Sequence, residues 1–187
     1  GETITLVFGR FNPPTIGHKK LLDSAKSVSD GDLKIYPSRS FDPKKNPLDP
    51  NQKASLMKKM FPDHADNIIN DESVRTIFDA MDLAKEEGYS NVQIVVGSDR
   101  VSEFDSLAQK YYKDDFETIE TISAGERDAE GEGVEGMSAS KMRKAASEND
   151  FETFRSGIPD TVDDKTAKSI MNTVRNAMQV TKESWSL

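Results

Sequence analysis

The sequence predicts an α/β fold built on a parallel sheet. Short apolar runs, each long enough for one strand, alternate with segments whose apolar residues recur at helical spacing. The run Val92–Val96 is largely apolar, which is typical of a strand covered on both faces. At 187 residues, with no repeat and no linker-like stretch, the chain fits one domain over residues 1–187. We expect a helical segment from about 150 to 187 to pack on it.

Each element is predicted from its pattern and from the residues at its ends. Strands are expected at 4–8, 33–36, 92–96 and 116–122. Helices are expected at 15–28, 51–60, 73–87, 101–112, 138–147, 150–154 and 166–180. For the third helix, Asp71 or Ser73 is the expected cap and Gly88 the expected end. Its apolar face would be Val74, Ile77, Phe78, Met81 and Ala84.

Composition limits the classes of function. Hydrophobic residues make up 35% of the chain and charged residues 31%, and no apolar run reaches the roughly 18 residues of a membrane span. The absence of cysteine excludes disulfides and thiolate chemistry and is compatible with the cytoplasm. The net charge of −8 argues against nucleic acid as a partner, while short lysine clusters suit a small anionic ligand.

Two segments have the character of phosphate-binding elements. The first, residues 9–18, follows the strand at 4–8, passes Pro13-Pro14 and enters a helix at Gly17-His18. Such a turn aims backbone N–H groups, the positive end of a helix dipole and an imidazole at one point, where phosphate binds. The second, residues 138–143, is another cationic helix start. We expect a nucleotide between them, since ligands of such sheets bind beyond the carboxyl ends of the strands.

The first segment reads Gly-Arg-Phe-Asn-Pro-Pro-Thr-Ile-Gly-His and resembles the G-x-F-x-P-x-H/T-x-G-H signature of the nucleotidyltransferases related to class I tRNA synthetases. The second, Met-Ser-Ala-Ser-Lys-Met-Arg at 137–143, resembles their I-S-S-T-x-x-R signature. The resemblance implies a Rossmann-like (HUP-type) parallel sheet of about five strands flanked by helices, with a helical C-terminus. It also implies that a nucleoside triphosphate reacts with a small phosphorylated acceptor and releases pyrophosphate.

The resemblance also assigns roles. His18 would donate to the α-phosphate, Thr15 would contact a phosphate through its hydroxyl, and Arg143 would hold the β- and γ-phosphates. Catalytic residues would be His18, Thr15, Lys44 and Arg143. Nucleotide-binding residues would be Gly9, Arg10, Phe11, Gly17, His18, Gly97, Asp99, Ser138, Ser140, Lys141 and Arg143. Mg²⁺ would be bound to ATP, which is the substrate, and the protein would have no metal site of its own.

The acceptor side resembles two branches of this family. Lys44 and Lys45 lie in a loop similar to the acceptor loop of pantetheine-phosphate adenylyltransferases, although Gln52-Lys53 stands where that branch has Glu-Arg. These lysines would bind the acceptor phosphate, or the loop is an exposed turn. Gly97 and Asp99 resemble the G-x-D of nicotinamide- and nicotinate-mononucleotide adenylyltransferases. Asp99 would bond a ribose hydroxyl or simply cap the next helix.

Other features receive plainer interpretations. Gly131–Gly136 matches G-x-G-x-x-G, but its glutamates would repel pyrophosphate, so we interpret 125–136 as a lid. His64 is expected in a surface turn, and two histidines without cysteine argue against structural zinc. The stripe formed by Ile170, Met171, Val174 and Met178 fits a core or an interface, so a homo-oligomer is compatible with the sequence.

The function predicted is adenylyl transfer from ATP to nicotinamide mononucleotide or a phosphopantetheine-like acceptor. Adenine is favoured because the cytidylyltransferase signature R-T-x-G-I-S-T-T is absent. Ala139 replaces a serine of the second signature and supports the alternative of a non-catalytic nucleotide-binding domain. A cytidylyltransferase is a further alternative.

Overall fold

The computed structural model describes residues 2–125 and 137–179. Its sheet is parallel and consists of β1 (Thr3–Gly9), β2 (Asp32–Pro37), β3 (Asn91–Val96) and β4 (Thr118–Ser123). The order is β2-β1-β3-β4, which confirms the α/β class with a parallel sheet. The described residues form four strands, where the resemblance implied about five.

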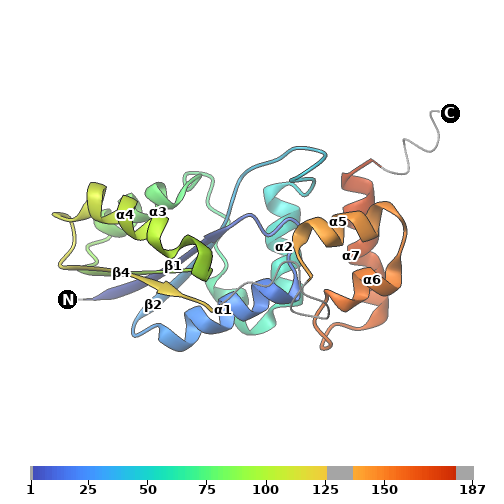
Figure 1. Cartoon of the computed structure of the whole chain (residues 1–187), viewed down its shortest axis with the longest axis horizontal. Coiled ribbons are helices and arrows are strands. Elements are labelled where there is room, and N and C mark those ends of the chain that lie inside the picture. The colour runs from blue at the N-terminus through green and yellow to red at the C-terminus, as the bar shows by residue number, and fades with distance from the viewer. Residues whose placement is uncertain (1, 126–136, 180–187) are drawn as a thin grey trace.

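Seven α-helices and two short 3₁₀ helices surround this sheet in the described residues. The α-helices are α1 (Ile16–Val28), α2 (Pro50–Met60), α3 (Ile77–Glu86), α4 (Val101–Tyr112), α5 (Ala139–Ser147), α6 (Phe151–Ser156) and α7 (Asp164–Ala177). The 3₁₀ helices are η1 (Pro62–Asn67) and η2 (Ser98–Arg100). Figure 1 shows α5, α6 and α7 gathered at one end of the molecule, beyond the ends of the strands.

The strand order reverses at β1, because the chain moves from β1 to β2 on one side and later to β3 on the other. Pairing with β2 continues to Gly9 opposite Pro37, whereas pairing with β3 stops at Leu6 opposite Ile94. The carboxyl ends of β1 and β3 therefore separate. Such a switch point is where parallel α/β sheets bind ligands.

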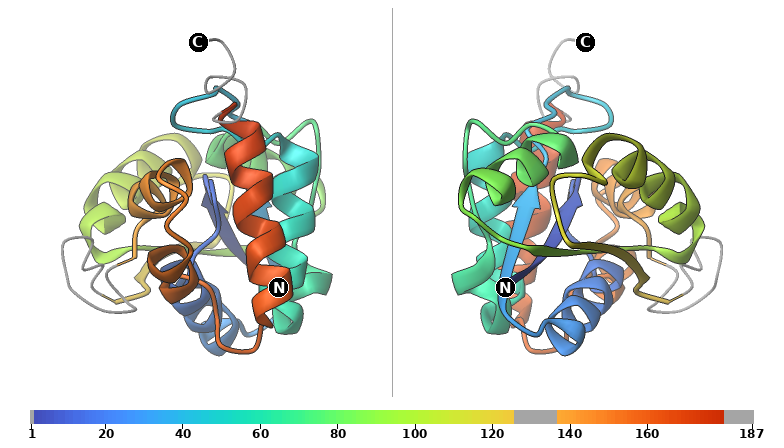
Figure 2. Two further views of the ribbon diagram at one scale, coloured as in Figure 1. Left: turned by 90° about the vertical axis from the view of Figure 1, so that its right-hand side faces the viewer. Right: turned by 90° about the vertical axis from the view of Figure 1, so that its left-hand side faces the viewer.

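Alternation along the strands builds two hydrophobic cores. Val7 and Val95 face a core shared with α1, α2 and the C-terminal helices, whereas Leu6 and Ile94 face a core shared with α3 and α4. The two end-on views in Figure 2 show these helices on opposite sides of the sheet. This packing fixes the ends of the strands and hence the loops that follow them.

Several sequence-based expectations need correction. The third helix begins at Ile77 rather than near Ser73, because Thr76 and Asp79 form a capping box. His64 is not a surface residue: only 1% of it is exposed, and its Nε2 lies 2.6 Å from Asp23 Oδ1. The stripe on α7 follows one of the two expected alternatives, because Ile170, Met171 and Val174 are buried in the core shared with α1 and α2 and Met178 packs against it.

None of the helices in residues 2–125 and 137–179 has the length and apolar character needed to cross a membrane.

Candidate active site

Asn12 holds three distant segments together at the carboxyl end of β1. Its amide donates to the Leu48 carbonyl oxygen at 3.1 Å and accepts from the Leu48 N–H at 2.9 Å. The backbone carbonyl of Asn12 accepts a hydrogen bond from Arg143 Nη1 at 2.8 Å. The loop after β1, the loop after β2 and the start of α5 therefore meet at one buried asparagine. This brings the two signature segments together, as the sequence predicts.

His18 is oriented by the cap of α1. The Thr15 N–H donates to His18 Nδ1 at 2.9 Å, and the ring packs edge-on to Phe11 with centroids 4.8 Å apart. Because Nδ1 accepts a hydrogen bond from a backbone amide, the neutral ring carries its hydrogen on Nε2. The capping box thus prepares His18 as a hydrogen-bond donor.

The N–H groups in the first turn of α1 have partners within the protein, contrary to our expectation that they are free for phosphate. Ile16 N donates to the Gly157 carbonyl at 2.9 Å, and Gly17 N donates to Thr15 Oγ1 at 3.1 Å. His18 N donates to the Thr15 carbonyl at 2.9 Å. Anion binding at this end of α1 therefore depends on side chains and the helix dipole.

The start of α5 supplies hydroxyl groups and a guanidinium. Ser138 caps the helix by accepting from Lys141 N at 3.2 Å, and its hydroxyl lies 3.0 Å from that of Ser140. Arg143, one turn further on, is half-buried. Burial lowers its pKa, the Asp42 carboxylate counters this effect and Arg10 adds to it. Arg143 stays a cation, since an arginine does not deprotonate in a protein.

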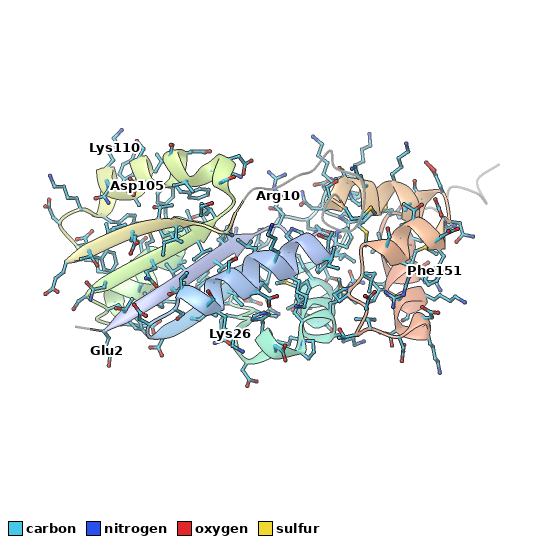
Figure 3. The ribbon with its side chains drawn as sticks, turned by 60° about the horizontal axis from the view of Figure 1, so that its bottom comes forward. Glu2, Arg10, Lys26, Asp105, Lys110 and Phe151 are labelled. Carbon is cyan, nitrogen blue, oxygen red and sulfur yellow. The ribbon has the colours of Figure 1, made fainter. Side chains whose placement is uncertain are left out.

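Arg10 is exposed at the end of β1, and Figure 3 shows its side chain between the sheet and the C-terminal helices. Burial is the largest cause that lowers the pKa values of Arg143 and Lys53, and the charge of Arg10 lowers both further. The adjoining Gly9 carbonyl accepts from Ser38 N at 2.7 Å, so the loops after β1 and β2 lie side by side. Arg10 therefore lies within electrostatic reach of two other cations at the ligand edge of the sheet.

Gly17 and Gly97 differ in the space beside their backbone. A Cβ on Gly17 would meet only Thr15 Oγ1, at 3.4 Å, whereas one on Gly97 would lie 2.9 Å from Asp99 Oδ1, so that carboxylate occupies the space beside Gly97. Asp99 is exposed and caps neither η2 nor α4. The alternative of Asp99 as a plain helix cap is therefore wrong.

Lys44 and Lys45 lie in an exposed turn closed by Asp42. Asp42 Oδ1 accepts from the N–H groups of both lysines, at 3.1 and 2.7 Å. Together with the Asn46 amide, these bonds lower the pKa of Asp42 to about 2. Neither ammonium group makes a hydrogen bond or ion pair with residues 2–125 or 137–179. The structure does not draw these two lysines into the junction at Asn12.

Sequence reasoning missed two residues of the site. Asn12 occupies a variable position of the signature, so nothing in the motif marks it. Lys53 is fully buried, and its Nζ donates to Ser38 Oγ at 3.1 Å. Its spacing from Met57 and Met60, both buried on α2, places it on the inner face of that helix and was a usable signal.

A metal site formed by the protein alone is not apparent in the part of the chain that the structure describes, where no three histidine or carboxylate side chains cluster suitably. The glycine-rich segment interpreted as a lid lies, after Gly125, outside the described residues.

The switch point of this parallel sheet lies beside a positioned histidine on α1 and an arginine on α5, in the place where α/β proteins of this architecture bind ligands. The cytidylyltransferase-like family model matches residues 6–145, and the chain belongs to this family within the nucleotidyltransferase superfamily. The search of curated proteins gave no match.

Solved structures show the same fold. One is a candidate nicotinate-nucleotide adenylyltransferase from Vibrio parahaemolyticus, with a TM-score of 0.56 and 19% sequence identity. The alignment covers 89% of this chain and 99% of that one, so the similarity of fold extends over most of this chain.

Proposed function

We propose that the protein transfers an adenylyl group from ATP to a small phosphorylated acceptor and releases pyrophosphate. The observation that carries this proposal is the hydrogen bond from Thr15 N to His18 Nδ1, which leaves the hydrogen of the neutral ring on Nε2. A donor so fixed, at the end of β1 and beside the Arg143 junction, suits a reaction in which negative charge builds up on a phosphoryl group.

The chemistry needs no general base. An oxygen of the acceptor phosphate, already ionised at neutral pH, attacks the α-phosphorus of ATP, and the bond from that phosphorus to the bridging oxygen of pyrophosphate breaks. His18 would stabilise the charge on the α-phosphoryl oxygens through its Nε2 hydrogen. Arg143, with the hydroxyls of Ser138 and Ser140, would hold the departing pyrophosphate. Mg²⁺ bound to the triphosphate would neutralise further charge.

Nicotinamide mononucleotide, nicotinate mononucleotide and phosphopantetheine-like molecules are the acceptors we would test first. The first two agree with Gly97 and Asp99 at the end of β3 and with the description of the Vibrio relative. The third agrees with the loop that carries Lys44 and Lys45. ATP is preferred to CTP because the cytidylyltransferase form of the second signature is absent.

The test is pyrophosphate release with each of ATP, CTP, GTP and UTP, with Mg²⁺, against this panel of acceptors. We expect release with ATP and one acceptor, and formation of the matching dinucleotide or dephospho-cofactor product. Release with CTP alone would identify a cytidylyltransferase instead.

A nucleotide-binding domain without catalysis is the second candidate, and Ala139 favours it because a hydroxyl is missing from the start of α5. Losing one hydrogen bond costs about 1 kcal/mol, which is too little to abolish transfer by itself. ATP that raises the melting temperature while no acceptor yields pyrophosphate would establish this second candidate.

A further inference from the structure

Lys53 is a buried cation without a counter-ion among residues 2–125 and 137–179. The residue has 0% of its surface exposed, and within these residues the only hydrogen bond of its ammonium group is the one to Ser38 Oγ at 3.1 Å. No carboxylate pairs with it in the described residues. Lysines are almost never fully buried unless they are paired, so this position calls for an anion.

The charged groups that act on Lys53 are themselves cations. Arg39 and Arg10 both lower its pKa, after burial, which is the larger cause; the resulting pKa is about 8. Arg39 is turned toward Asn70, to which its Nη1 donates at 2.7 Å, and Asp71 lies within its electrostatic reach. Three positive charges are thus assembled around Ser38, at the carboxyl ends of β1 and β2.

The bond to Ser38 also sets the direction of the serine hydroxyl. Lys53 Nζ can only donate, so Ser38 Oγ accepts from it, and the serine keeps its own hydrogen for another acceptor. Ser38 N is already bonded to the Gly9 carbonyl at 2.7 Å, which ties this hydroxyl to the loop that carries Arg10. A phosphate oxygen is the acceptor that would complete this arrangement.

We propose that Ser38 and Arg10 bind the acceptor's phosphate monoester and that Lys53, beneath Ser38, is the positioning residue that supplies the buried positive charge. The assignment of this phosphate to the acceptor rests on the proposed function, whereas the phosphate site itself does not. Arg10 then separates the acceptor phosphate from the triphosphate held near Arg143, which would place the attacking oxygen close to the α-phosphorus. Lys44 and Lys45, exposed in their turn, would not be the main phosphate ligands.

The first test is thermal unfolding of the whole chain with and without inorganic phosphate. The variants are Lys53→Met, a side chain of similar length without charge, and Lys58→Met, the matched control on the exposed side of α2. Without phosphate, Lys53→Met should melt above the wild type because it removes an uncompensated buried charge. Phosphate should raise the melting temperature of the wild type and Lys58→Met by several degrees and that of Lys53→Met by less than a third as much.

The difference in melting temperature between Lys53→Met and the wild type should depend on pH, which would not be the case if Lys53 had only a structural role. The charge of Lys53 destabilises the phosphate-free protein fully below pH 8, and this effect disappears between pH 8 and 10.5 as the folded protein releases the proton first. The melting-temperature gap between Lys53→Met and the wild type should therefore narrow over that range. Phosphate shifts that are equal in all three proteins, or a Lys53→Met variant less stable than the wild type at every pH, would overturn the proposal.

Two further variants test the phosphate site without changing Lys53. Ser38→Ala should also reduce the phosphate-induced rise in melting temperature, whereas Arg143→Gln should not change it. If inorganic phosphate bound at the triphosphate site instead, Arg143→Gln would reduce the rise and Ser38→Ala would not. An unchanged shift in Ser38→Ala would count against the site.

Kinetics separate this proposal from the proposed function. Once an acceptor is identified, Lys53→Met should raise the acceptor KM at least tenfold and leave the ATP KM within twofold. Transfer with an unchanged acceptor KM would overturn the phosphate site alone. Absence of transfer with every acceptor, together with a Lys53-dependent phosphate shift, would overturn the proposed function alone.

Discussion

Single residues of this protein do more than the signatures reveal. The motifs identified His18 and Arg143, because each combines a chemical group with a position at a helix start. They could not identify Asn12, whose role comes from meeting Leu48 and Arg143 across the fold. Lys53 was hidden for a related reason: a lysine in a helix is ordinarily solvated, and only the packing of α2 shows that this one is enclosed.

Replacement of Asn12 tests whether its side chain fixes the loop of the first signature against the loop at Leu48. Asn12→Ala removes both bonds to Leu48 and leaves a buried N–H without its partner, so we expect a loss of about 1–3 kcal/mol in the free energy of unfolding. Pyrophosphate release should fall more than stability alone explains, because the loop whose backbone carbonyl accepts the Arg143 bond is no longer fixed to Leu48. Urea unfolding and initial rates measure the two effects, with Asn172→Ala, on the exposed face of α7, as the control. Equal rates for the two variants would contradict this role.

Elements were predicted well where periodicity and end signals agree. β1, α1, α2 and α7 follow the expected ranges within a few residues, since their apolar patterns are strong. The start of α3 was misplaced because Asp71 and Ser73 look like caps in sequence, while they form a turn with Ser73 N bonded to Asp71 Oδ1. The helix begins after Thr76 because the capping box of Thr76 and Asp79 provides hydrogen-bond acceptors for the backbone N–H groups of both residues.

The turn at 42–46 depends on the ionised carboxylate of Asp42. The folded pKa of Asp42, about 2, lies below the ordinary value of 3.8, so its hydrogen bonds hold the turn fully above pH 3.8 and are lost as the pH falls through 2. An NMR titration of the Asp42 carboxyl carbon should show a midpoint near 2. In Asn46→Ala, which removes one donor, the midpoint should move toward 3.8. A wild-type midpoint at the ordinary value would show that the turn does not hold the carboxylate.

The sheet and the C-terminal helices form one packed unit. The Gly157 carbonyl, after α6, accepts the first N–H of α1, and the helices α5 to α7 complete the core beneath β1. Sequence could place these helices in order, but it could not show that the phosphate-facing helix end would be closed by a distant carbonyl. That contact depends on packing between segments more than a hundred residues apart.

Gly157 tests this coupling. A Cβ at this position would overlap Met142 Sδ and press on Met137, in a core that is already filled. Gly157→Ala should therefore reduce the free energy of unfolding by about 1–3 kcal/mol. Chemical denaturation measures this loss, and the exposed neighbour Ser156→Ala should lose far less. Equal stability of the two variants would mean that the contact with α6 is loose.

In the proposed reaction, His18 donates a hydrogen bond to the reacting phosphoryl group. The most direct measurement is the rate of pyrophosphate release by the wild type and by His18→Ala, with ATP and the identified acceptor, at equal occupancy by ATP. We expect the variant to be slower by a factor of 100 or more, which corresponds to about 2.7 kcal/mol of lost transition-state stabilisation. A variant that releases pyrophosphate at the wild-type rate would contradict the claim.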